Sequence, residues 1–139
     1  MTTLDEIIEF VRERTGVQNV NPESDINSEL GVDGDDFHEL MSEYSDKFNV
    51  DMDNFLWYFH SDEEGQNLGG IFFAPPYKRV DRIPVTPKTL FTFSETGSWN
   101  INYPKHELPK KRYDMILNRF IGILMVLAMV IILIFKYLK

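Results

Sequence analysis

The sequence predicts a mainly α-helical protein, in which a small bundle of three to four helices precedes one C-terminal transmembrane helix. Apolar residues recur at helical spacing in two stretches of the N-terminal half, and an apolar run without charge lies near the C-terminus. The chain of 139 residues contains no cysteine, which excludes a disulfide framework and a cysteine nucleophile. We expect an acidic domain over 1–100, a basic juxtamembrane linker over 101–114 and a transmembrane helix over 115–138.

Charge is distributed very unevenly along the chain. Residues 1–65 hold 18 acidic and three basic residues, whereas residues 66–139 hold 11 basic and four acidic ones. An acidic segment is repelled by nucleic acid and attracted to basic protein surfaces. We therefore expect a protein partner with a basic surface and no nucleic-acid partner; the alternative is that the acids only keep a small domain soluble.

The first helix is predicted over 4–15. Its apolar positions follow helical spacing: Leu4, Ile7, Ile8 and Val11. Thr3 and Glu6 match the pattern of a capping box, and Gly16 is a typical residue for a helix C-terminus.

The second helix is predicted over 35–48. Its apolar stripe is Phe37, Leu40, Met41, Tyr44 and Phe48. Asp53 is a candidate cap for a third helix over 53–59, and residues 71–73 are expected to be extended before Pro75.

A short fourth helix is predicted over 87–95. Thr86 suits the cap and Pro87 the first helical position, while Gly97 ends the helix. Leu90, Phe91 and Trp99 are expected to pack inward.

The transmembrane prediction is based on sixteen uncharged residues from Phe120 to Phe135. As a helix they span about 24 Å, against about 30 Å for the hydrocarbon core, so apolar neighbours on both sides have to extend the span. The membrane-flanking cations are Lys110, Lys111, Arg112, Arg119 and Lys136. With Lys105 and Lys139 included, five cations precede the run and two follow it, which places the N-terminal domain in the cytoplasm.

Five acidic residues gather at the start of the second helix: Asp33, Asp35, Asp36, Glu39 and Glu43. They can cap the helix and favour its dipole, or they can form a recognition face, and the two roles are compatible. Consecutive acids in an exposed turn do not match a calcium loop or an acid–base pair. The three histidines are scattered and are expected in surface or capping roles, so no metal site is predicted: His38, His60 and His106.

Residues 29–40 read Glu-Leu-Gly-Val-Asp-Gly-Asp-Asp-Phe-His-Glu-Leu. This turn resembles that of acyl carrier proteins, which it matches at Leu30, Gly31, Asp33, Glu39 and Leu40. The chain is also similar over about 4–100 to a bacterial family of acyl-carrier-like proteins, DUF1493, through the Gly-x-x-Gly-Asp-Asp turn and a later stretch. That later stretch comprises Ile83-Pro84-Val85-Thr86, Leu90 and Gly97-Ser98-Trp99.

The resemblance implies an acyl-carrier-like bundle at a bacterial inner membrane, but with one departure. Carrier proteins attach phosphopantetheine to a serine at the start of the second helix, where this sequence has Gly34. Glycine offers no hydroxyl, so no cofactor is expected.

These observations predict a non-catalytic, membrane-anchored binding protein that docks a partner through the acidic start of its second helix. Two alternatives stay open. One is an atypical carrier in lipid or envelope synthesis, with a lipid-sized cavity among Leu40, Met41, Phe55 and Leu56. The other is a small subunit of a membrane complex, in which the transmembrane helix itself makes the contact. Membrane lipids are expected to contact residues 115–138 in each case.

Overall fold

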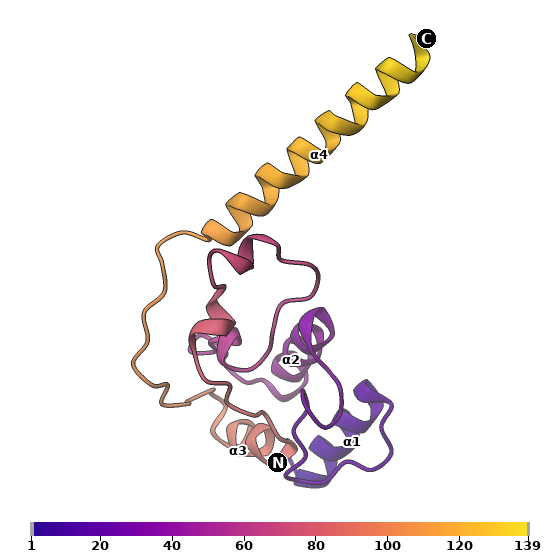
Figure 1. The fold of residues 1–139 in the computed structure, drawn as a ribbon. Coiled ribbons are helices and arrows are strands. Elements are labelled where there is room, and N and C mark those ends of the chain that lie inside the picture. Colours follow the sequence, from indigo (N-terminus) through magenta and orange to yellow (C-terminus); the bar gives the residue numbers. More distant parts are fainter. Residues whose placement is uncertain (1, 139) are drawn as a thin grey trace.

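The computed structural model describes residues 2–138 as a helical domain from which one long helix projects (Figure 1). Its α-helices are α1 (Leu4–Thr15), α2 (Gly34–Phe48), α3 (Pro87–Thr96) and α4 (Tyr113–Tyr137). Three short 3-10 turns lie between α2 and α3: η1 (Trp57–Phe59), η2 (Gly69–Ile71) and η3 (Pro76–Arg79). These residues contain no β-strand, and one isolated parallel bridge joins Asp51 to Ser98. The mainly helical class is confirmed.

Helix α1 begins and ends at the predicted residues. The Thr3 side chain accepts from the Glu6 N–H at 3.3 Å, and the Glu6 carboxylate accepts from the Thr3 N–H at 2.8 Å. Gly16 ends the helix with a φ of 70°, which glycine adopts without strain. The predicted capping box and C-terminal glycine are confirmed.

Helix α2 buries the predicted stripe and provides the centre of the core. Its buried side chains are Phe37, Leu40, Met41 and Tyr44. The Tyr44 hydroxyl donates to the Leu90 carbonyl of α3 at 2.6 Å, so a polar atom in the core has a partner. Leu40 and Met41, which the lipid-handling hypothesis placed beside a cavity, are each 3 % exposed and pack within this core.

Helix α3 also follows its sequence signals and packs against α1. Thr86 accepts from the Thr89 N–H at 3.2 Å, Pro87 is the first helical residue, and Gly97 ends the helix at a φ of 70°. Leu90 and Trp99 are both completely buried, as predicted.

The helix predicted over 53–59 is wrong, because only Trp57–Phe59 form a single 3-10 turn. Asp51 accepts from the Asp53 N–H at 2.9 Å, and the Tyr103 hydroxyl accepts from the Leu56 N–H at 3.2 Å. The N–H groups of Phe55, Phe59 and His60 donate to carbonyl groups three residues earlier, so this segment forms separate tight turns rather than an α-helix. The extended segment predicted over 71–73 is also wrong, because Ile71 belongs to η2 and Phe72 has helical backbone angles, a φ of −97° and a ψ of −34°.

His60 lies in the aromatic part of the core, contrary to the surface or capping role predicted for it. It is fully buried, its ring stacks on Phe55 with centroids 5.2 Å apart, and it contacts Trp99 edge-on. Its Nε2 is 2.8 Å from the Tyr103 hydroxyl, which already accepts from the Trp99 indole N–H at 2.9 Å and from a backbone N–H. That hydroxyl must therefore donate to Nε2, and the His60 proton resides on Nδ1, 2.8 Å from the Ile83 carbonyl.

Helix α4 extends over 25 residues, or about 37 Å. It is long and apolar enough to cross a membrane, and its most apolar window has no buried residue. Figure 1 shows that it leaves the domain at the end opposite α3, with η2 beside its base. The predicted C-terminal apolar helix is confirmed and begins at Tyr113.

The buried histidine predicts a stability that depends on pH. Burial lowers the pKa of His60 to about 4, against an ordinary value of 6.5. The unfolded chain therefore binds a proton between pH 6.5 and 4 while the folded chain does not, so stability is complete above this window and falls as the pH falls through it. The expected loss is about 3 kcal/mol at pH 4. Urea unfolding of the full chain in detergent, followed by tryptophan fluorescence, measures it.

The matched variant for this prediction is His60→Gln, which cannot titrate. Its absolute stability is expected to fall, but its stability should change much less between pH 6.5 and 4 than that of the parent. An equal pH dependence in both proteins would contradict the buried, neutral histidine.

Candidate functional site

At the start of α2, the hydrogen bond that a cap residue would normally accept is accepted by a serine from a distant loop. Asp33 occupies the cap position in an extended conformation, but its side chain makes no capping hydrogen bond. The buried Gly34 N–H instead donates to the Ser61 hydroxyl at 3.1 Å. The predicted capping role of Asp33 is therefore wrong, and its carboxylate is free to interact elsewhere.

Four of the five predicted acidic residues are exposed: Asp33, Asp35, Asp36 and Glu39. Within residues 2–138, no basic side chain lies within ion-pair distance of any of these four. Glu43 differs, because it is half-buried and pairs with Arg14 of α1. The name acidic face is used below for the four exposed carboxylates.

The acidic face borders two separate hollows. Asp35 lines a pocket of about 800 Å³ on the side of α4. Asp36 and Glu39 line a smaller hollow of about 270 Å³ between α1 and α2, together with Glu43. Successive helical residues point about 100° apart, so neighbouring acids can face different surroundings.

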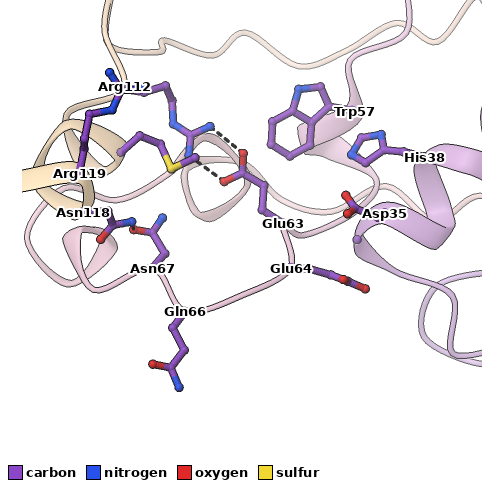
Figure 2. Close-up of a pocket in the computed structure, with 12 residues that line it drawn as sticks. Asp35, His38, Trp57, Glu63, Glu64, Gln66, Asn67, Arg112, Asn118 and Arg119 are labelled. Carbon is purple, nitrogen blue, oxygen red and sulfur yellow. Dashed lines mark hydrogen bonds and ion pairs between the residues drawn. The ribbon is translucent and has the colours of Figure 1, made fainter. Parts of the chain in front are cut away.

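The larger pocket lies where the start of α2, the 57–67 segment and the base of α4 meet (Figure 2). Figure 2 shows Asp35 and His38 on one side and Arg112 and Arg119 on the other, with Glu63 between them. The His38 ring contacts the Trp57 ring edge-on at 5.6 Å. Both signs of charge line this pocket, so it does not select strongly for an anion or a cation.

Arg112 joins the base of α4 to the domain. Its guanidinium makes two hydrogen bonds of 2.7 Å to the Glu63 carboxylate and two, of 2.9 and 2.6 Å, to Asp114. These bonds, those to Asp114 first, raise the pKa of Arg112 above its usual range, so its charge is permanent. Arg112 was predicted as a membrane-flanking cation, but its N–H groups donate to the carboxylates of Glu63 and Asp114. The other four predicted flanking cations are exposed: Lys110, Lys111, Arg119 and Lys136.

An amide network completes this junction. The Asn67 side chain donates to the Asp114 carboxylate at 2.9 Å, and the Asn118 side chain donates to the side-chain amide oxygen of Asn67 at 2.8 Å. The Gly69 N–H donates to the side-chain amide oxygen of Asn118 at 2.6 Å. Asp114 is only 2 % exposed, so its charge depends on these partners. The name α4 clamp is used below for these residues: Glu63, Asn67, Gly69, Arg112, Asp114 and Asn118.

Gly69 permits the close approach of η2 to α4. A Cβ at this position would lie 2.1 Å from the Asp114 backbone oxygen, which real Cβ atoms do not tolerate. The sequence predicted no role for Gly69. Asp114 and Asn118 were the available signals, because they are polar residues in the first turns of a largely apolar helix.

Gly34 lies where the carrier pattern has its serine, and its surroundings disfavour any side chain. Its φ of 54° is in the left-handed region, and a Cβ would meet the Glu64 side chain at 1.9 Å. A serine here would be strained and would displace Glu64. Within residues 2–138, no group of three His, Asp or Glu side chains is arranged to hold a metal ion.

The fold and this site define an acidic helical domain joined to one long apolar helix. The chain belongs to the family described as protein of unknown function (DUF1493), whose model matches residues 2–100. The predicted membership of DUF1493 is therefore confirmed, and α4 lies outside the match. Comparisons with curated proteins and with solved structures gave no significant match.

The α4 clamp predicts that Gly69→Ala loosens the junction between η2 and α4. The new methyl group collides with the Asp114 backbone, and overpacking of this kind costs about 2 kcal/mol. Hydrogen exchange of the amides in 66–72 should become faster by more than tenfold, since about 1.4 kcal/mol corresponds to a factor of ten. Exchange of the full chain in detergent, read by mass spectrometry, measures this effect.

Gly122→Ala is the matched control, because nothing lies within 4 Å of a Cβ built at Gly122. Its exchange in 66–72 should equal that of the parent. Unchanged exchange in Gly69→Ala would show that η2 is not held against α4 in this way.

Proposed function

We propose that this protein is a non-enzymatic, single-pass membrane adaptor that docks a basic protein surface through its acidic face. The observation that carries the proposal is the set of four exposed carboxylates at the start of α2, none of which has an ion-pair partner within residues 2–138. Carboxylates without internal partners are available to a partner's Lys and Arg side chains, and they steer its approach.

Helix stabilisation accounts for only part of the acidic face. Asp35 and Asp36 are in the first turn of α2, where a negative charge favours the helix dipole. Glu39 lies beyond that turn, and the dipole effect fades within one turn. Glu39 is exposed, so neither the helix nor the core of the domain gains from its charge. A binding role explains why all four acids are present.

The anchor in this proposal is α4, with the N-terminal domain in the cytoplasm at a bacterial inner membrane. The basic residues Lys110 and Lys111 precede α4, are exposed, and favour the cytoplasmic side. An anchor confines the domain and a membrane-bound partner to two dimensions, which raises their effective concentration. At this raised concentration, a docking face of modest affinity is sufficient for the domain to bind its partner.

An acyl-carrier-like ancestry fits the same residues. The turn at 29–40 precedes a helix with an acidic face, as in the carriers that it resembles, and Gly34 replaces the attachment serine. The conformation of Gly34 supports the view that no prosthetic group is carried, because the backbone here suits glycine and Glu64 covers the position. Without the prosthetic group, docking is the part of carrier behaviour that these residues can still perform.

The test reverses the charge of the acidic face in the full-length protein. The triple variant Asp35→Lys, Asp36→Lys and Glu39→Lys should reduce capture of the partner from native membranes by about tenfold or more, which corresponds to about 1.4 kcal/mol of binding free energy. Chemical crosslinking in membranes followed by quantitative mass spectrometry measures capture.

A control with the same change in net charge is the variant Asp46→Lys, Asp53→Lys and Glu95→Lys, whose three side chains are exposed elsewhere on the domain. It should retain the partner. Equal capture by both variants and the parent would sink the docking proposal, whereas equal loss in both would reduce it to a general effect of net charge.

A further inference from the structure

The segment 68–73 exposes large apolar side chains to an unusual degree. Ile71 is 76 % exposed and Phe72 is 73 % exposed, while Leu68 and Phe73 are 46 % and 44 % exposed. A contiguous group of large apolar side chains on a domain surface marks a site of contact. The name apolar loop is used below for these four residues.

The α4 clamp holds the apolar loop against the base of the projecting helix. Gly69, inside this segment, donates its N–H to Asn118 and has no side chain to separate it from Asp114. The Phe73 ring lies 5.7 Å from the Tyr113 ring at the first residue of α4. Figure 1 shows η2 directly beside the start of α4 and far from α3. The apolar loop is therefore continuous with the apolar surface of α4.

The length of α4 places this loop at the depth of the hydrocarbon boundary. The uncharged run from Phe120 to Phe135 covers about 24 Å, which leaves about 6 Å of a 30 Å hydrocarbon core to be filled. Asn118 and Asp114, which contact η2, lie about 3 and 9 Å below Phe120 along the helix axis. Apolar neighbours on both sides of the run extend it, and those on the domain side, Met115 to Leu117, lie at the level of η2.

Polar groups at this level do not oppose entry into the membrane interface. Asn118 is bonded to Asn67 and to the Gly69 N–H, so its amide is satisfied within the protein. Arg119 is exposed, and its long side chain can reach the headgroups. Lys78 and Arg79 follow the apolar loop in η3 and are also exposed.

We propose that the apolar loop inserts into the leaflet that faces the domain and forms a second membrane contact beside α4. Ile71 and Phe72 enter the boundary between headgroups and acyl chains, at the level where Met115 to Leu117 extend the apolar run of α4. The contact fixes how far the domain stands from the bilayer. This inference rests on the membrane span proposed for α4.

Spin-label accessibility tests the insertion directly, because the chain contains no cysteine and each label site is unique. The full-length variants Phe72→Cys, Val126→Cys and Glu95→Cys are labelled with a nitroxide and placed in vesicles of phosphatidylethanolamine and phosphatidylglycerol. All three native side chains are exposed, so none of the changes removes a core contact. Collision rates with oxygen, which concentrates in lipid, and with a water-soluble nickel chelate report the depth.

The expected result is an oxygen-to-nickel ratio at residue 72 that is several-fold above that at residue 95 and below that at residue 126. A ratio at residue 72 equal to that at residue 95, with residue 126 deep in lipid, would overturn the insertion and leave the span intact. Low accessibility of residue 72 to both reagents would show that protein, not lipid, covers the loop, and would also overturn it. A water-exposed residue 126 would remove the span itself and the insertion with it.

Discussion

Arg112 occupies the position on which the rest of this structure depends. It is bound on one side by Glu63, from the domain, and on the other by Asp114, from α4. A buried carboxylate such as Asp114 is tolerated only when it is paired and hydrogen-bonded, and Arg112 and Asn67 meet that requirement. This junction holds the segment 63–69 against the base of α4. It thereby also positions the pocket and the apolar loop.

The half of the domain that follows α2 is ordered by side chains more than by regular elements. Between α2 and α3 only short 3-10 turns occur, and the segment after α3 has no helix until α4. Tyr103 compensates for this by binding three partners at once: His60, Trp99 and the Leu56 backbone. A buried network in which each polar group has a partner can fix a conformation as firmly as a helix does.

The four α-helices were predictable because their signals are local. A capping box, a period of apolar residues and a terminal glycine lie within one helix, as α1 shows with Thr3, Glu6 and Gly16. The 3-10 turns at Trp57 and Ile71 were not predictable from local signals. Their neighbouring backbone N–H groups donate to side chains far along the chain, Tyr103 and Asn118. Five acidic residues were predicted for the partner-binding face, and four of them are exposed; the pairing of Glu43 with Arg14 was missed because it joins two helices.

The α4 clamp holds the acidic face at a fixed position relative to α4, the proposed membrane anchor. The most direct measurement is the distance distribution between nitroxide labels at Ser42→Cys on α2 and Val126→Cys on α4, two exposed positions, by pulsed electron paramagnetic resonance in vesicles. A rigid α4 clamp predicts one narrow distribution that broadens when Arg112→Gln removes the charge pairs. A broad distribution in the parent, unchanged by Arg112→Gln, would mean that the domain swings freely on its anchor and would contradict the account.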